Sequence, residues 1–165
     1  MKDIDLIRNW QRGDEHAFKT LYERYRRPLY AYLNRLTNGN AHVADDLYQE
    51  VWMRAIDHFD GYRENDRFLS WLFRIAHNLA VDHFRRQRTV SEELAPDSIM
   101  DEQPSAAERL DRDVVSKALE DAIRSLNPDQ REVVELRRNG LPFKEIAAIQ
   151  DVSINTVLGR MHYAV

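Results

Sequence analysis

One face of the segment 68–88 gathers side chains whose chemistry suits a nucleic-acid strand. At helical spacing, Arg74, Asn78 and Arg85 lie opposite the apolar residues, and Trp71 flanks them. Arginine contacts phosphate, asparagine hydrogen-bonds to base edges, and tryptophan stacks on unpaired bases. Arginines near a helix C-terminus also stabilise the helix through its dipole, so those that close this segment fit a purely structural role equally well.

Motifs of enzymatic or metal chemistry are missing from the sequence. Six histidines and 28 acidic residues occur, but there is no H-E-x-x-H, no P-loop and no catalytic carboxylate pair, and His77 and His83 fit surface or packing roles. The lack of cysteine excludes disulfides and suits a reducing cytoplasm. No apolar run approaches the roughly 20 residues that span a bilayer. We therefore expect a cytoplasmic protein that is not an enzyme, holds no metal or other cofactor and does not insert into a membrane.

Helices must position these side chains, and helical periodicity recurs throughout the chain. No strand-like alternation of any length appears, so we expect an all-α fold. Asp3 is placed to cap a first helix that Gly13 ends, and a second helix begins near Asp14. Pro28 predicts a kink or break in the second helix, and residues 38–40 predict a turn after it.

A third helix, predicted over about 43–58, has one apolar and one polar face at ~100° per residue. Its predicted core face consists of Ala44, Leu47, Tyr48, Val51, Trp52 and Ala55. The opposite face carries Asp46, Gln49, Glu50, Met53 and Asp57. An acidic face can simply be solvated, but a methionine exposed among acids also suits docking onto a basic partner.

A polar loop, 59–67, separates the third helix from the fourth. Asn65 or Asp66 is placed to cap the fourth helix, predicted over 68–88. This helix is expected to turn five apolar residues inward, namely Leu72, Ile75, Ala76, Leu79 and Ala80. Its outward face is the one that suits nucleic acid.

The acidity of the chain, whose net charge is -4, is concentrated in residues 91–108. This segment contains six acidic residues, no basic residue, two prolines and no aromatic residue. Such a polar stretch cannot bury enough apolar surface to offset the entropy lost on ordering. We predict a flexible linker between two small helical domains, 1–90 and 109–165; an acidic spacer without further role is an equal alternative.

The end of the chain has the layout of a helix-turn-helix. A helix around 111–124 precedes it, and Asn127-Pro128 starts another that stops at Asn139-Gly140. Two short helices then follow across a turn at 150–152. Their predicted anchors are Phe143, Ile146, Ala147 and Ile149 in the first, and Val152, Ile154 and Val157 in the second, which Ser153 caps. The second helix of this layout presents its early residues to the major groove, although helical hairpins without DNA function share the pattern.

Three segments in order resemble the extracytoplasmic-function (ECF) group of bacterial RNA polymerase sigma factors. ADDLYQEVWMRAIDHFDGY resembles the helix by which the group docks on polymerase, and FLSWLFRIAHNLAVDHFRRQR resembles its promoter-melting helix. LNPDQREVVELRRNGLPFKEIAAIQDVSINTV resembles the module that reads the upstream promoter element. The resemblance covers almost the whole chain, and three ordered motifs are far more specific than one.

The resemblance implies a role for particular residues. Positions that match polymerase docking are Asp46, Gln49, Glu50, Met53 and Asp57. Loop positions that match the capture of a flipped base of the minus-ten element are Gly61, Tyr62, Arg63 and Arg67, and Asn78 and Asp82 match positions on the adjoining helix that face this DNA. The side-chain chemistry of the nucleic-acid face adds Trp71, Arg74, Arg85 and Arg86 to the expected minus-ten contacts. Positions that match minus-thirty-five recognition are Lys144, Ser153, Asn155, Thr156, Arg160 and His162.

The resemblance also implies partners: core RNA polymerase through its β′ and β subunits, promoter DNA, and an inhibitory anti-sigma factor that covers the docking and reading faces. We expect the exposed surroundings of Met53 and Tyr62, and the apolar Leu158 and Met161, to contact that inhibitor. Most of the affinity for DNA would then come from the polymerase, which accommodates an acidic sigma chain.

The chain departs from the family pattern within its helix-turn-helix. Asp151 stands where the family usually has glycine in the turn, and Leu158 and Gly159 stand where it usually has a basic residue and serine. A leucine can still contact a thymine methyl group. A stand-alone helix-turn-helix regulator is the alternative; it would bind free duplex DNA tightly and core polymerase poorly, and it leaves the face of Asp46 unexplained.

Overall fold

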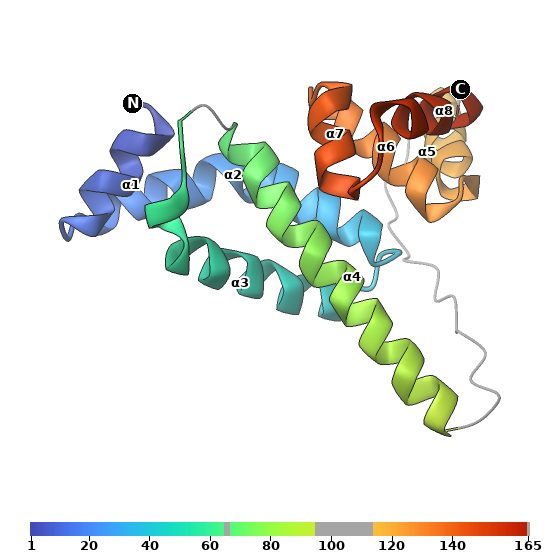
Figure 1. Cartoon of the computed structure of the whole chain (residues 1–165), viewed down its shortest axis with the longest axis horizontal. Helices are drawn as coiled ribbons and strands as arrows, with labels where there is room; N and C mark the ends of the chain where they lie inside the picture. The colour runs from blue at the N-terminus through green and yellow to red at the C-terminus, as the bar shows by residue number, and fades with distance from the viewer. Residues whose placement is uncertain (65–66, 95–113, 165) are drawn as a thin grey trace. The chain divides into compact units, whose positions relative to one another are not determined.

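The computed structural model describes residues 1–64, 67–94 and 114–164, and every regular element in these ranges is a helix (Figure 1). The elements are α1 (Asp3–Gln11), α2 (Glu15–Leu36), α3 (Ala41–Asp57), the short 3-10 helix η1 (Phe59–Gly61), α4 (Phe68–Leu94), α5 (Val114–Ser125), α6 (Pro128–Arg138), α7 (Phe143–Gln150) and α8 (Ile154–Ala164). The all-α prediction is confirmed. Within the described ranges, none of these helices combines the length and apolarity needed to cross a membrane.

The backbone divides into two compact units, Met1–Asp82 and His83–Val165, and the division falls within α4. This helix runs to Leu94, so the fourth helix is longer than predicted and includes the first residues assigned to the linker. The rest of the predicted linker, 95–108, lies outside the described residues, as do the proposed caps Asn65 and Asp66.

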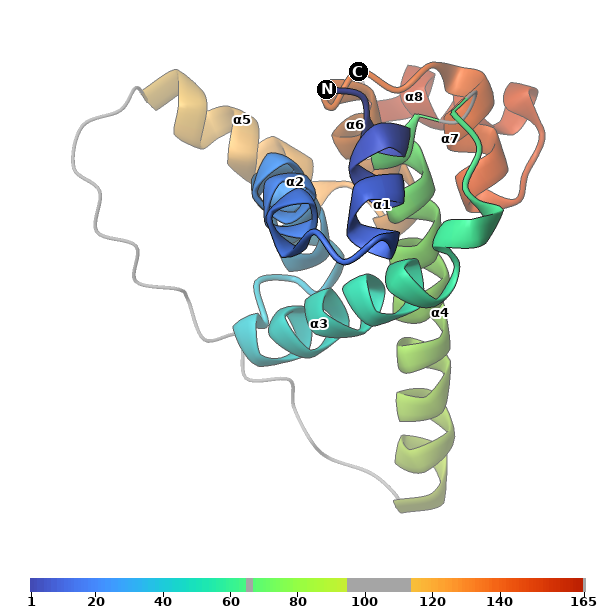
Figure 2. The ribbon, with the colours of Figure 1, turned by 90° about the vertical axis from the view of Figure 1, so that its left-hand side faces the viewer.

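The start of the first unit corrects one prediction, because Asp3 does not cap α1. Lys2 occupies the N-cap position, and its side chain makes no capping hydrogen bond. The Asp3 carboxylate instead accepts hydrogen bonds from the Tyr25 hydroxyl at 2.6 Å and from Arg24 Nη1 at 2.7 Å. Burial, together with the Asp3 carboxylate, raises the pKa of the Tyr25 hydroxyl far above its ordinary value. The residue that looked like a cap thus fastens α1 to α2, which lie side by side (Figure 2).

Helix α2 continues through Pro28, so of the two expected outcomes, a kink or a break, the break does not occur. A proline inside a helix removes one hydrogen bond and costs ~3 kcal/mol or more. Here Leu21 and Leu29 are buried on either side of it, with 1% and 0% of their surface exposed, and this packing holds the helix together. The turn after α2 is confirmed: Asn38 and Gly39 have φ angles of 53° and 77°, in the left-handed region that ends helices.

Aromatic side chains from α1, α2, α3, η1 and α4 form the core of the first unit. The ring centroids of Trp10 and Phe59 lie 5.4 Å apart in an edge-to-face arrangement. Those of Tyr32 on α2 and Phe73 on α4 lie 4.5 Å apart. Aromatic pairs at such separations contribute about 0.5–1.5 kcal/mol each beyond the burial of their area. This core fixes how α3 and α4 are presented.

The predicted faces of α3 are confirmed in full. The six expected core residues, Ala44, Leu47, Tyr48, Val51, Trp52 and Ala55, are all buried. Helix α4 follows its prediction closely, with Leu72, Ala76, Leu79 and Ala80 buried, but Ile75 is only partly buried. Phe73 is also fully buried, although it was not among the predicted core residues. It lies at the edge of the apolar face of the helix, and its large ring packs against Tyr32.

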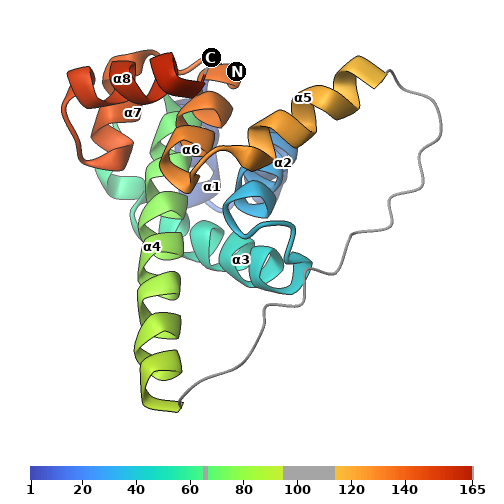
Figure 3. The same ribbon diagram turned by 90° about the vertical axis from the view of Figure 1, so that its right-hand side faces the viewer.

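The second unit contains α5 to α8, with α7 and α8 both packed on α6 (Figure 3). The Asn127 side chain accepts a hydrogen bond from the Gln130 backbone N–H at 2.9 Å, which confirms the predicted start of α6. Val157 anchors α8 as predicted, with none of its surface exposed. Ile154 was expected to anchor α8 as well, but 46% of its surface is exposed.

Candidate functional site

The outward face of α3 is an acidic surface with an apolar centre. All five residues predicted there are exposed, namely Asp46, Gln49, Glu50, Met53 and Asp57. Met53 is 66% exposed. Glu50 lies 3.5 Å from Arg54 in an i,i+4 ion pair between half-exposed side chains, a geometry of modest energy that leaves the carboxylate accessible. The structure thus brings the predicted docking residues together on one face.

The loop after α3 is held in place by an aromatic residue that we expected to be exposed. Tyr62 is only 4% exposed. Its ring centroid lies 5.2 Å from that of Phe68 and 5.4 Å from that of Trp71. Tyr62 is therefore a loop anchor and not part of an accessible face; the prediction of exposure was wrong because loop composition does not reveal tertiary packing. Gly61, Arg63 and Arg67, which were predicted to contact minus-ten DNA, are exposed.

Two contacts, one from the end of α1 and one from its N-cap residue, hold the flanks of this loop. Gln11 Nε2 donates a hydrogen bond to Asp60 Oδ1 at 2.7 Å, and Lys2 Nζ lies 2.9 Å from Glu64 Oε1. Both contacts are exposed and contribute little to stability, but they restrict where the loop can lie relative to α4.

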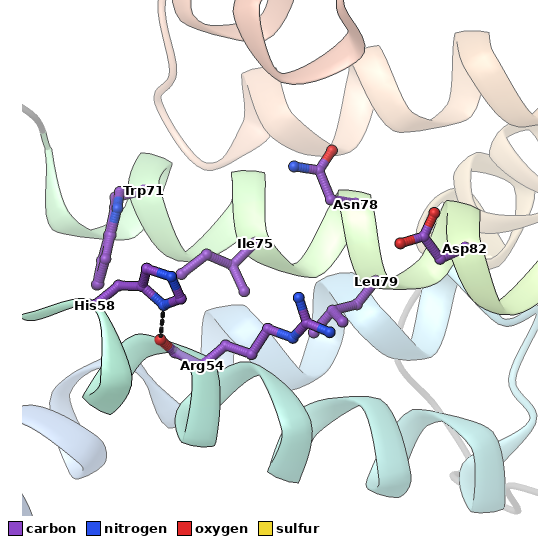
Figure 4. A pocket seen from close by; sticks show the side chains of 7 residues that line it. All are labelled: Arg54, His58, Trp71, Ile75, Asn78, Leu79 and Asp82. Atoms are coloured by element: carbon purple, nitrogen blue, oxygen red, sulfur yellow. Dashed lines mark hydrogen bonds between the residues drawn. The ribbon is translucent and has the colours of Figure 1, made fainter. Parts of the chain in front are cut away.

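A pocket of about 200 Å³ opens between the end of α3 and the middle of α4. Figure 4 shows the residues that line it, which are Arg54, His58, Trp71, Ile75, Asn78, Leu79 and Asp82. Three of them, Trp71, Asn78 and Asp82, are minus-ten residues predicted from the sequence. Arg54 and His58 were missed; their i,i+4 spacing at the end of α3 was visible, but a pocket is a tertiary feature that one helix does not reveal.

The pocket combines an apolar wall with polar groups of both kinds. Ile75 and Leu79 supply apolar surface, and Trp71 adds an aromatic ring. His58 Nδ1 lies 2.8 Å from the backbone carbonyl oxygen of Arg54. Because a carbonyl can only accept, Nδ1 carries the proton, and Nε2 of the neutral ring remains a hydrogen-bond acceptor. A flat, partly apolar molecule with polar edges fits this set of groups.

The remaining predicted minus-ten residues are basic side chains along α4. Arg74, Arg85 and Arg86 are all exposed. Arg74 and Asn78 are four residues apart and therefore share one face of α4, so a cation lies beside the pocket. A phosphate-bearing strand that placed one base in the pocket could meet this arginine.

The helix-turn-helix of the second unit has the predicted turn. Asp151 adopts a left-handed conformation with φ 53°, and the Thr156 backbone N–H donates to Ser153 Oγ at 3.2 Å, which caps α8. The Ser153 and Thr156 hydroxyl oxygens also lie 2.9 Å apart. Five of the six predicted minus-thirty-five residues are exposed, namely Lys144, Ser153, Asn155, Thr156 and His162.

Arg160, the sixth predicted residue, is turned toward its own unit. Its side chain is 24% exposed, and its Nη2 lies 3.2 Å from Asp129 Oδ2 of α6. Nη1 donates a hydrogen bond to Gln150 Oε1 at 2.8 Å. Leu158, by contrast, is 43% exposed beside the candidate readers.

Comparison with known proteins matches two separate regions of the chain to family profiles. The family profile of Sigma-70 region 2 matches residues 21–90, and that of Sigma-70 region 4 matches residues 116–164. The chain is 30% identical to the ECF RNA polymerase sigma factor SigW of Bacillus subtilis, covering 94% of this chain and 89% of that protein. It is 33% identical to the ECF sigma factor BldN of Streptomyces coelicolor over 88% of this chain, but it spans only 56% of that longer protein.

Among solved structures, the sigma factor RpoE from Bartonella quintana, crystallised with the anti-sigma factor NepR, is similar, with a TM-score of 0.67 and 26% identity. The match covers 89% of this chain and 91% of RpoE. A region 2 profile over the first unit is not expected of a stand-alone helix-turn-helix regulator, so that alternative is not favoured. The chain belongs to the ECF group of bacterial sigma factors, the transcription initiation factors that bind core RNA polymerase and direct it to promoter DNA.

Proposed function

We propose that the two ends of the chain divide the work of promoter recognition. Residues 1–90 dock on polymerase and capture a base of the minus-ten element, 91–108 thread the polymerase as an acidic linker, and 109–165 read the minus-thirty-five element. The chain acts in the cytoplasm, where its polymerase partner is, and it catalyses no reaction itself. The observation that carries this proposal is the pocket between α3 and α4, which has the size and chemistry for one unpaired base.

The docking part of the proposal rests on the exposed acidic face of α3. Asp46, Glu50 and Asp57 present negative charge around the apolar side chain of Met53. A basic coiled coil on the β′ subunit would complement this face, since charges at the rim steer association while an apolar centre supplies buried area.

The base-capture part rests on the groups that line the pocket. A flipped base needs a surface on which to stack and polar groups at its edge, and Trp71 and Asn78 supply one of each. Asn78 is exposed on α4, so its amide can meet a base that enters from outside. The pocket is smaller than the roughly 300–1,000 Å³ typical of sites for drug-sized ligands, which favours a single base over a larger molecule.

Transcription from templates with a randomised minus-ten element tests this assignment. Core polymerase with the native chain should select one base strongly at the position that enters the pocket. Asn78→Ala should relax that preference by about 1–3 kcal/mol at that position alone, because the amide reads a base edge.

Arg74→Ala is the matched control on the same face of α4. Arginine contacts phosphate, so this variant should weaken transcription from all templates alike and reduce its sensitivity to salt. The same sequence-independent defect in both variants would refute base reading by Asn78.

We further propose an anti-sigma partner that competes with core polymerase for the face from Asp46 to Asp57. Support comes from the exposed Met53 and Leu158, which offer apolar contacts on each unit, and from the RpoE complex with NepR. Tyr62 is removed from the expected contacts because it is buried. Affinity capture from cells of the source organism should recover a protein that added core polymerase displaces; recovery of polymerase subunits alone, in induced and uninduced cells, would contradict the proposal.

A further inference from the structure

A chain of polar contacts links the three helices of the helix-turn-helix region through one glutamine. Gln150, the last residue of α7, donates from Nε2 to Glu132 Oε2 at 2.8 Å and to the Asp129 backbone carbonyl at 3.2 Å. Its Oε1 accepts from Arg160 Nη1 at 2.8 Å. Because the amide nitrogen faces two acceptors and the oxygen faces a guanidinium, the orientation of the amide is fixed.

The contacts of Gln150 with Glu132 and Arg160 are partly sheltered from water, whereas the Asp129 side chain is 65% exposed. Glu132 on α6 is 4% exposed, and the Arg160 side chain is 24% exposed. Hydrogen bonds to charged groups are stronger than neutral ones, and low local polarity strengthens them further. Arg160 completes the chain by pairing with Asp129 on α6 at 3.2 Å, so one guanidinium reaches two helices.

The apolar packing of α8 is too narrow to fix this helix by itself. Over its whole span, Ile154–Ala164, Val157 is the one residue that is fully buried. Met161 and Ala164 on the same helix are only half-buried, so apolar contacts alone fix its rotation weakly, since burial is not directional. The bonds of Gln150 and Arg160 are directional, and Arg160 lies almost one turn after Val157 on the same helix.

We propose that Gln150 and Arg160 are positioning residues that form a brace between α6, α7 and α8. The brace sets the rotation at which α8 presents Asn155 and Thr156 to DNA, and Arg160 does not itself contact a phosphate. This inference rests on the proposed reading of the minus-thirty-five element by the second unit, and it removes Arg160 from the readers expected from the sequence.

Holoenzyme binding to a duplex that carries the minus-thirty-five element, measured across a salt series, tests the brace. Arg160→Ala and Gln150→Ala should each weaken binding by about tenfold. The double variant should bind DNA as tightly as the single variant that binds less tightly, because either substitution alone already breaks the brace. The slope of log K against log salt should stay at its native value. Additive losses, or a slope reduced by about one unit in Arg160→Ala, would overturn the proposal, since the loss of a phosphate contact changes the slope in this way.

Arg160→Lys separates positioning from charge while keeping the chain folded. Lysine binds phosphate as a point charge but cannot bridge Gln150 and Asp129 with a planar fork. The brace therefore predicts that Arg160→Lys loses as much DNA binding as Arg160→Ala, with native helicity by circular dichroism. Near-native DNA binding by the lysine variant would show that only the positive charge at this position is needed, and it would contradict the proposed brace.

Asn155→Ala and Lys144→Ala report separately on the proposed function. Both residues are exposed and form no bond of the brace. Lys144 lies on α7, so Lys144→Ala should weaken binding additively with Gln150→Ala, whereas Asn155→Ala should cost less in the Gln150→Ala background because the brace positions the Asn155 contact. If these two variants and Arg160→Ala all bind like the native chain, the reading of DNA by this unit is wrong and the inference falls with it. If only the Arg160 and Gln150 variants behave contrary to expectation, the brace fails and the proposed function stands.

Discussion

Reversing two charges on α3 should abolish binding to core polymerase and leave the fold intact. Asp46 and Glu50 are both exposed, and the Glu50–Arg54 pair joins side chains that are 49% and 52% exposed at 3.5 Å. A surface pair of this kind contributes about 0.3–0.5 kcal/mol. We therefore expect the Asp46→Lys/Glu50→Lys variant to keep its helicity and nearly all of its free energy of unfolding.

The effect on binding should be much larger than the effect on stability. Each substitution turns an attraction toward a basic partner into a repulsion, and like charges facing each other in an interface cost several kcal/mol. Even about 1.5 kcal/mol at each position gives a total of ~3 kcal/mol, which raises the Kd for core polymerase by more than about 100-fold. Titration of fluorescently labelled chain with core polymerase measures this Kd directly.

Glu15→Lys/Glu23→Lys on α2 is the matched control. It changes the net charge from -4 to 0, as the α3 variant does, because each reversal adds two charges. Glu23 resembles Glu50 in that it is 55% exposed and pairs with an arginine of its own helix, Arg26, at 4.0 Å. The control should bind polymerase normally. Native Kd in the α3 variant, or an equal loss in the control, would refute docking through this face.

Three further predictions concern the packing and turns that present the sites. Tyr62→Ala should lower the free energy of unfolding by about 3–5 kcal/mol in chemical denaturation, because the buried ring anchors the loop; a loss below about 1 kcal/mol would contradict that role. Asp151→Val should destabilise the second unit by about 1–2 kcal/mol and Asp151→Gly should not, because φ at this turn is 53°; a thermally stable valine variant would show that the turn is not strained. Gly159→Ala should stabilise the chain by about 1 kcal/mol, since an added Cβ meets nothing within 4 Å and alanine is the better helix former; a lower melting temperature would contradict this.

The amphipathic parts of the fold could be predicted from the sequence because periodicity encodes them directly. The faces of α3 are the clearest case, since each of the six predicted core residues is buried and each outward residue is exposed. The turns could also be predicted from the sequence, because Gly39 and Gly140 adopt the positive φ angles for which glycine is suited. Local chemistry decides these features, and tertiary packing reinforces them.

The errors arose where a tertiary partner overrides a local signal. Asp3 has the type and place of a cap but binds Tyr25 instead. Arg160 has the type and place of a DNA contact, and its pairing with Gln150 and Asp129 is likewise a tertiary feature; its exclusion from the DNA contacts is our proposal. Both side chains find partners on other helices, and no single-helix pattern contains that information.

Only those pocket residues that lie on one helix could be grouped from the sequence, because the pocket itself is a tertiary feature. Trp71, Asn78 and Asp82 share the outward surface of one helix, so periodicity grouped them. Arg54 and His58 join them only because α3 ends beside α4. The pocket therefore became visible once the two helices were placed together, and its role in reading a base remains a proposal.

Transcription of a genomic fragment library by core polymerase, with and without this chain, tests the central claim most directly. The account predicts that the chain causes transcripts to start at a small set of discrete sites, whose upstream sequences share a minus-ten and a minus-thirty-five element. Core polymerase alone should give no such sites. Identical transcript patterns in both reactions, despite a folded chain, would contradict the assignment of this protein as a promoter-directing sigma factor.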